Sequence, residues 1–135
     1  MIHMQKYKVY YEDTDAGGVV YYANYLKFLE RGRSDFLTLG EISQVNLGES
    51  GVFFVVKRCN VEYFSSAKLE DEACVYSEII EIGKVAVQFI QEVKVQERLC
   101  VKAFVKVACV EISSGKFKPM AIPVDILEKI KSLQK

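Results

Sequence analysis

The sequence predicts an α+β domain in which one antiparallel five-stranded sheet curls around one long helix and a short helix closes the chain. Three observations predict this class. A strand-like segment and a strongly periodic helix come first, four strand-like segments follow one another, and an amphipathic helix ends the chain. Short turns between the later segments favour antiparallel hairpins. The 135 residues fit a single domain, residues 1–135, that is large enough to bury a core.

The first two elements are predicted from the spacing of apolar residues. Residues 6–12 alternate between aromatic or aliphatic and charged side chains, which predicts a first strand that includes Tyr11. Helical spacing then relates the apolar residues Tyr25, Phe28, Leu29, Phe36 and Leu39. Gly32 stands where this stripe would have its next apolar residue, so the bare backbone permits close approach to a sheet. Gly40 suits the left-handed residue that ends a helix.

The rest of the sheet is predicted from four later segments. Residues 41–51 are predicted to form a loop, and strands are expected at 52–64, 73–82, 85–96 and 99–112. In the first of these strands, alternation places on one face Phe53, Val55, Cys59, Val61 and Tyr63. Turns at 82–84 and 113–116 indicate hairpins, and Pro123 opens the short C-terminal helix. Strands this long, apolar on both faces, predict a homo-oligomer.

Composition excludes several classes of function. The chain has 18 Lys+Arg and 18 Asp+Glu, so its net charge of zero indicates neither a nucleic-acid nor a membrane-surface partner. No apolar run resembles a membrane span or a signal peptide, so we expect a cytoplasmic protein without membrane insertion. The four cysteines lack C-x-x-C spacing and are predicted to be buried free thiols. His3 is the only histidine, which excludes a multi-histidine metal site; no metal is expected.

The segment from Asp13 to Gly18 is the main candidate for chemistry. Its two aspartates lead through two glycines into a helix that has no Ser, Thr, Asp or Asn cap directly before its apolar run. A carboxylate therefore precedes backbone N–H groups that are free to bind an oxyanion. The segment is a poor calcium loop, because its twelfth position is Asn24 rather than glutamate. It also lacks the lysine of a phosphate-binding loop. The remaining alternative is that both aspartates only make turns or cap the helix.

The pattern D-x-D-x-x-G-x-V-x-[YH]-x-x-Y resembles the signature of the 4-hydroxybenzoyl-CoA thioesterase family, whose members have the hotdog fold. The residues that match are Asp13, Asp15, Gly18, Val20, Tyr22 and Tyr25. The segments at 54–72 and 118–123 are similar to the acyl-CoA thioesterases associated with the bacterial Tol-Pal system. The resemblance spans nearly the whole chain.

This resemblance implies a reaction and roles for two residues. Asp15 would attack the thioester carbon to give a mixed anhydride, or act as the base for a water molecule. The backbone N–H of Tyr22 would donate a hydrogen bond to the thioester oxygen. The Tol-Pal-associated members commonly have histidine where this chain has Tyr22, and a tyrosine hydroxyl is a poor acid or base near neutral pH. No cofactor is implied, because coenzyme A is part of the substrate.

The resemblance also implies a substrate site and an assembly. Lys84 and Arg58 are the candidates for the coenzyme A phosphates. The expected lining of the acyl group is Gly18, Val19, Val20, Tyr25 and Tyr63. Family members are usually tetramers, as dimers of dimers, with the site between two subunits. Two alternatives stay open: a hydroxyacyl-thioester dehydratase, for which the histidine is lacking, and a non-catalytic module that binds acyl-carrier or envelope-associated partners.

Overall fold

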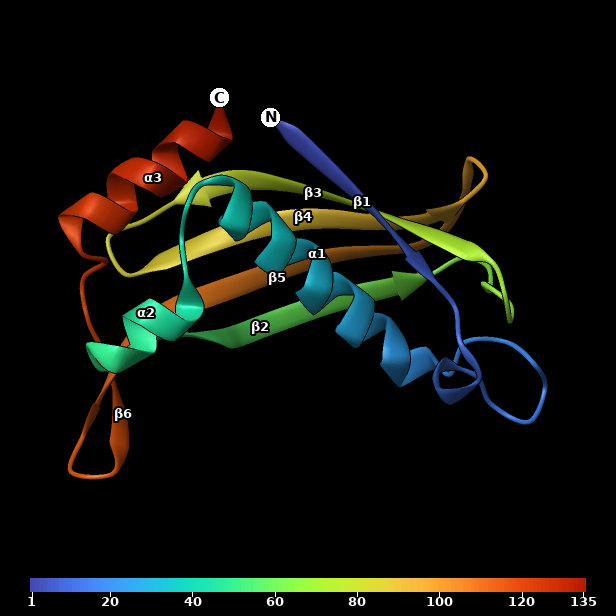
Figure 1. Ribbon diagram of the computed structural model, residues 1–135, viewed down its shortest axis with the longest axis horizontal. Coiled ribbons are helices and arrows are strands. Elements are labelled where there is room, and N and C mark those ends of the chain that lie inside the picture. The colour runs from blue at the N-terminus through green and yellow to red at the C-terminus, as the bar shows by residue number, and fades with distance from the viewer.

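The computed structural model describes residues 1–135 and contains one six-stranded antiparallel sheet. Its strands lie in the order β1-β3-β4-β5-β2, and β6 pairs with the end of β5 (Figure 1). The bounds are β1 Ile2–Lys8, β2 Val52–Tyr63, β3 Glu72–Ile82, β4 Ala86–Val95, β5 Arg98–Ser113 and β6 Lys116–Pro119. The helices are α1 Tyr25–Leu39, α2 Gln44–Glu49 and α3 Val124–Gln134. The predicted class is confirmed, with β6 as a short addition to the five expected strands.

The long helix α1 lies across one face of the sheet, and the core fills the space between them (Figure 1). Gly32 marks the closest approach, because a Cβ built there would lie 2.6 Å from Cγ1 of Val75 on β3. The predicted role of this glycine is therefore confirmed. α3 packs at the far end of α1, where a Cβ on Gly40 would lie 2.8 Å from Cδ1 of Leu133. None of the helices has the length and hydrophobicity of a membrane-spanning segment.

Three details at the ends of β1 and α1 differ from the prediction. β1 ends at Lys8, and Tyr11 lies in a 3-10 turn (η1, Tyr11–Asp13) with 81% of its surface exposed. Leu39 is exposed, whereas Leu37 is buried and lines the same cavity as Ile130 of α3. Gly40 has φ −86°, and the left-handed residue is Glu41 with φ 60°. Gly40 is thus needed for its small size and not for its conformation.

A β-bulge divides β2 into two halves whose side chains alternate out of phase. Val56 pairs with Val107 and Arg58 pairs with Lys106, so Lys57 is the extra residue. Directly opposed residues in an antiparallel pair share a face. Val56 therefore faces α1 together with Phe54, Cys59, Val61 and Tyr63, which are opposite core residues of β5. The prediction that Phe53 and Val55 share the face of Cys59 is wrong, because the bulge reverses the alternation.

The remaining differences are small. The predicted loop at 41–51 contains α2, which is capped by Ser43: its hydroxyl accepts the N–H of Asn46 at 3.2 Å. All four cysteines are free, as predicted. Two of them are not buried as predicted: Cys59 is exposed on the edge strand β2, and Cys74 of β3 is half-buried. Burial raises the pKa of the Cys109 thiol, which disfavours the reactive thiolate.

Candidate active site

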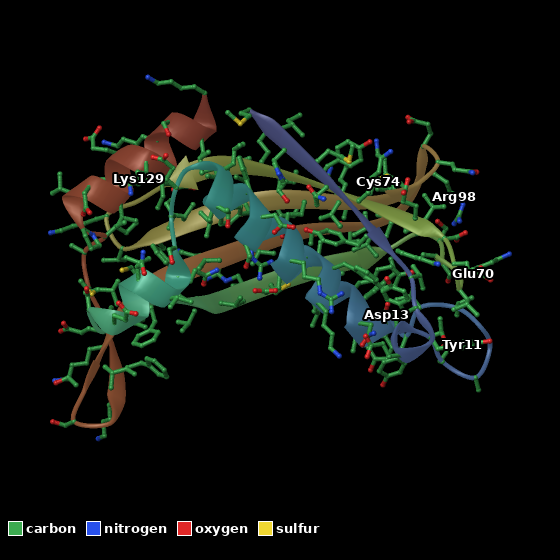
Figure 2. All side chains as sticks on the ribbon, viewed as in Figure 1. Tyr11, Asp13, Glu70, Cys74, Arg98 and Lys129 are labelled. Carbon is green, nitrogen blue, oxygen red and sulfur yellow. The ribbon has the colours of Figure 1, made fainter.

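Asp13 is a structural carboxylate. Its side chain is 2% exposed, and Oδ2 accepts the N–H of Tyr10 at 2.9 Å while Oδ1 accepts Nδ2 of Asn24 at 3.0 Å. Its backbone carbonyl accepts the N–H of Tyr21 at 2.9 Å. Asp13 therefore ties the end of the first strand region to the beginning of α1, where Figure 2 shows it. These contacts make Asp13 a support residue of the loop.

Asp15 lies in a tight exposed loop and is available for chemistry. Its Oδ1 accepts the N–H of Gly17 at 2.8 Å, and its carbonyl accepts the N–H of Gly18 at 3.0 Å. Gly18 has φ +79°, which only glycine adopts without strain. The N–H of Asp15 donates to the carbonyl of Val19 at 2.9 Å and closes the loop. The second carboxylate oxygen of Asp15 accepts no hydrogen bond within the chain, and the residue is exposed, so this oxygen is open to a substrate or a water molecule.

The beginning of α1 is uncapped, as the sequence predicts. A 3-10 turn (η2, Tyr22–Asn24) runs directly into the helix, and neither Tyr21 nor Asn24 caps it with a side chain. Asn24 uses its side-chain amide to bind Asp13 instead. The N–H groups of Tyr22 and Ala23 consequently donate no hydrogen bond within the chain. Free amides at a helix N-terminus carry partial positive charge and suit a developing oxyanion.

Three tyrosines gather beside these free amides. The ring of Tyr63 lies 6.2 Å from that of Tyr22 and 5.8 Å from that of Tyr25, in edge-to-face contacts. The hydroxyl of Tyr63 donates to the backbone carbonyl of Tyr22 at 3.0 Å. Burial raises the pKa of the Tyr63 hydroxyl, so this group stays protonated and acts as a donor. The structure thus brings Tyr63 next to Tyr22 and Tyr25, although it lies 41 positions after Tyr22 in the sequence.

A backbone segment that the sequence does not mark holds the Asp15 loop in place. The carbonyl of Ala67 accepts the N–H of Val20 at 2.9 Å, and the N–H of Ala67 donates to the hydroxyl of Tyr25 at 2.9 Å. Val20 and Tyr25 are only 3% and 2% exposed, so both side chains belong to the core, whereas Val19 is partly exposed and pairs with Lys68. These contacts run through the backbone, which explains why side-chain patterns do not reveal Ala67.

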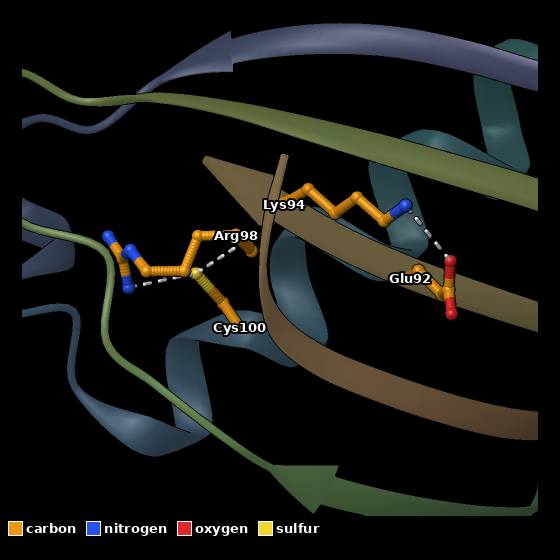
Figure 3. Close-up of polar contacts among 4 residues, drawn as sticks. All are labelled: Glu92, Lys94, Arg98 and Cys100. Carbon is orange, nitrogen blue, oxygen red and sulfur yellow. Dashed lines mark hydrogen bonds and ion pairs between the residues drawn. The ribbon is translucent and has the colours of Figure 1, made fainter. Parts of the chain in front are cut away.

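Arg98 anchors the same segment from the β4–β5 hairpin. Its Nη1 donates to Oγ of Ser65 at 2.8 Å and to the carbonyl of Ser66 at 3.0 Å. Figure 3 shows the guanidinium of Arg98 next to Cys100, with Nη1 3.8 Å from Sγ. Figure 3 also shows the neighbouring pair of Lys94 and Glu92 on β4. Arg98 therefore fixes residues 65–68, on which the Asp15 loop rests.

The two predicted phosphate-binding residues lie apart from this end of the sheet. Lys84 is in the β3–β4 turn, near the segment that leads into α3, because its carbonyl accepts the N–H of Ile122 at 2.9 Å. In Figure 1 this turn and the loop at 14–20 lie at opposite ends of the sheet.

Lys84, Lys57 and Lys106 line a hollow of about 370 Å³ on the sheet face away from α1. Arg58 is exposed next to this hollow but does not line it.

A smaller cavity of about 130 Å³ lies between α1 and the inner face of β2, and the sequence does not predict it. Its walls are mainly apolar, with Phe54, Val56 and Phe89 among them, and Arg33 lines it from α1. Nη1 of Arg33 donates to Oε1 of the buried Gln91 at 3.0 Å. Burial lowers the pKa of the Arg33 guanidinium, although the group stays charged. No group of three or more His, Cys, Asp or Glu side chains is placed to hold a metal ion.

The curled sheet around one long helix is the hotdog fold, and a free carboxylate ahead of an uncapped helix start has the chemistry that a thioesterase needs. Comparison with known proteins agrees. The model of the thioesterase-like superfamily matches residues 9–130, so the chain belongs to this family. The acyl-CoA thioesterase YbgC of Haemophilus influenzae is 45% identical over 120 residues, which cover 88% of this chain and 87% of that protein. The acyl-CoA thioester hydrolase YbgC of Escherichia coli O157:H7 is 41% identical over 125 residues, 92% of each chain.

Solved structures show the same fold. A probable thioesterase from Bartonella henselae is 31% identical and superposes with a TM-score of 0.84 over 91% of this chain and 100% of that one. A 4-hydroxybenzoyl-CoA thioesterase mutant complexed with 4-hydroxybenzoyl-CoA has a TM-score of 0.83 over 95% of this chain and 97% of that one. At 15% identity it is evidence for the fold alone. The resemblance inferred from the sequence motif is therefore confirmed.

Proposed function

We propose that this chain hydrolyses acyl-CoA thioesters to a free carboxylic acid and coenzyme A. One observation carries the proposal: the free carboxylate oxygen of Asp15 precedes a helix start at which the N–H of Tyr22 has no partner. The names of the YbgC relatives, which describe acyl-CoA thioesterases, support the same substrate class.

The reaction follows from these two groups. The carboxylate of Asp15 attacks the thioester carbon, the C–S bond breaks and coenzyme A leaves as a thiolate that takes up a proton. Water then hydrolyses the resulting mixed anhydride to the carboxylic acid and regenerates Asp15. In the alternative route, Asp15 removes a proton from a water molecule that attacks the same carbon. In both routes the N–H of Tyr22 stabilises the oxyanion of the tetrahedral intermediate. No metal or additional cofactor takes part.

Thiol release from a panel of acyl-CoAs tests the proposal. The panel should contain straight-chain acyl groups of increasing length and benzoyl-CoA, with acyl-carrier protein thioesters as a parallel series. We expect catalytic turnover of at least one acyl-CoA, at a rate proportional to enzyme concentration. Absence of turnover across the panel, together with stable capture of an acyl-carrier protein, would instead favour a non-catalytic binding module. Because Cys59 is an exposed thiol, product should be detected by chromatography rather than with a thiol reagent.

The hollow lined by Lys84, Lys57 and Lys106, called the lysine hollow from here on, is our proposed site for the coenzyme A phosphates. Lys84, Lys57 and Lys106 converge there, none of them is within an ion pair, and Glu81 is the only acidic residue in the lining. Lysine ammonium groups bind phosphates as point charges. Since the hollow and Asp15 lie at opposite ends of one sheet, we place one substrate across two chains, with the thioester on one and the nucleotide on the other.

The edge strand β2 supports assembly into dimers, and we propose a tetramer built as a dimer of dimers. The 12 residues of β2 pair with β5 on one side only. An unpaired edge of this length, with apolar side chains on its inner face, favours pairing with a second copy of the same strand. We further propose that the enzyme is cytoplasmic and that it acts together with the Tol-Pal system.

Replacement of Val56 by glutamate is expected to separate the subunits. Val56 is 51% exposed at the bulge of β2, so the change costs a single chain little. In a β2–β2 interface the carboxylate would be removed from water beside the cavity that Arg33 lines, and the cost of desolvating it exceeds what one nearby cation returns. Mass measurement in solution should show the wild type as a multiple of 15.4 kDa and the variant as a monomer. Val45→Glu, 74% exposed on α2, is the matched control. A wild-type protein that is monomeric at high concentration would contradict the assembly.

A further inference from the structure

We infer that Tyr63 is a positioning residue that holds the oxyanion-binding amide of Tyr22 in place. The inference rests on the proposed function and adds a role that differs from lining the acyl group. The observation behind it is the hydrogen bond from the hydroxyl of Tyr63 to the backbone carbonyl of Tyr22, 3.0 Å long and joining residues 41 positions apart.

The first turn of the helix needs such support because no side chain caps it. Tyr22 is the first residue of η2, and no side chain caps either η2 or α1. Uncapped first turns fray, since their N–H groups have no intrahelical partners. Tyr63 provides the only side chain that hydrogen-bonds the backbone of residues 22–24. Free amides are required for oxyanion binding, so the turn cannot be stabilised by an ordinary cap without loss of its donors. A bond to the carbonyl of Tyr22 avoids this conflict.

Tyr63 is itself held by the sheet. It is the last residue of β2 and pairs with Val101 of β5, while the N–H of the next residue, Phe64, donates to the carbonyl of Cys100 at 2.8 Å. Its ring contacts the rings of Tyr22 and Tyr25. A hydroxyl on a ring fixed in this way transfers the rigidity of the sheet to the first turn of the helix.

The same bond also strengthens a neighbouring donor. A carbonyl that accepts a hydrogen bond polarises its peptide group, and the peptide group of the Tyr22 carbonyl includes the N–H of Ala23. That N–H is the second free donor at the helix start. Tyr63 therefore acts on both candidate donors without touching the reacting atoms.

The variant Tyr63→Phe tests this role, because it removes the hydroxyl and keeps the ring. We expect kcat on the best acyl-CoA to fall about tenfold, since a small displacement of a donor is costly in the transition state. KM should change by less than about twofold. Hydrogen exchange of the segment at 21–26 should become faster, while the midpoint of thermal unfolding stays close to that of the wild type. Tyr11→Phe is the matched control, because Tyr11 is 81% exposed and its hydroxyl makes no hydrogen bond.

Two results would overturn the inference. An unchanged kcat in Tyr63→Phe would show that the hydrogen bond has no role in catalysis. A rise in KM with unchanged kcat would assign Tyr63 to the acyl-binding surface instead. Failure of the proposed function would be recognised separately, because the wild type would then release no thiol from any acyl-CoA.

Discussion

Replacement of Asp15 by asparagine is expected to lower kcat about 10³-fold, since the amide is neither a nucleophile nor a base at neutral pH. The fold should be preserved, because the Oδ1 of asparagine can still accept the N–H of Gly17 that Asp15 now binds at 2.8 Å. The exposed position of Asp15 in its loop also means that no buried group loses a partner.

Steady-state thiol release and chemical unfolding of Asp15→Asn check this expectation together. Asp125→Asn is a suitable control, because this exposed carboxylate lies in the first turn of α3, away from the Asp15 loop. The control should keep the wild-type kcat. If Asp15→Asn retained more than about a tenth of the wild-type kcat, Asp15 would be neither nucleophile nor base.

Replacement of Gly32 by alanine is expected to destabilise the protein by about 2 kcal/mol, which is typical of overpacking in a close-packed core. The new methyl group would lie 2.6 Å from Cγ1 of Val75, 3.2 Å from Oγ of Ser77 and 3.3 Å from Nε2 of Gln91. Gln91 cannot move freely, because its Nε2 donates to Ser77 at 2.8 Å and to the carbonyl of Leu29 at 2.9 Å. The better helix propensity of alanine, about 1 kcal/mol, offsets only part of the clash.

The free energy of unfolding in urea measures this effect. Lys27→Ala, at an exposed site of α1, is the control and should change stability by less than about 0.5 kcal/mol. The double variant Gly32→Ala with Val75→Ala makes space for the methyl group. It should therefore be more stable than the sum of the two single changes predicts. Strict additivity would show that the contact with Val75 is not the cause.

The sequence predicts the fold well where one periodic pattern covers a whole element. The stripe from Tyr25 to Phe36 places α1 and its buried face correctly, and Gly32 marks its closest contact with the sheet. Prediction fails where a distant element decides the outcome. Leu37 is buried in place of Leu39 because α3 covers that side of the last turn, and Gly40 is kept small by Leu133. Neither contact can be recognised from the spacing of apolar residues within α1.

The same distinction applies to the candidate site. The carboxylate of Asp15 and the uncapped start of α1 are local features, so their presence can be predicted from a few consecutive residues. The supports of the site are not local. Ala67 acts through its backbone, and Arg98 and Tyr63 reach residues 32 and 41 positions away in sequence. Only the paired strands of the folded sheet bring such residues together.

The bulge at Lys57 has a consequence for changes in chain length. Its two flanking pairs, Val56 with Val107 and Arg58 with Lys106, involve neighbouring residues of β5. Deletion of Lys57 would therefore convert β2 into a regular strand and leave every other side chain on its present face. Deletion of Arg58 would have the same effect, because Lys57 could then pair with Lys106 in its place. Deletion of a residue farther from the bulge, such as Phe54 or Val61, would shift part of the strand by one position and turn core residues toward solvent. The two bulge residues Lys57 and Arg58 are thus the positions at which this edge strand can lose one residue without a change in the core, and loss of Lys57 also removes one cation from the lysine hollow.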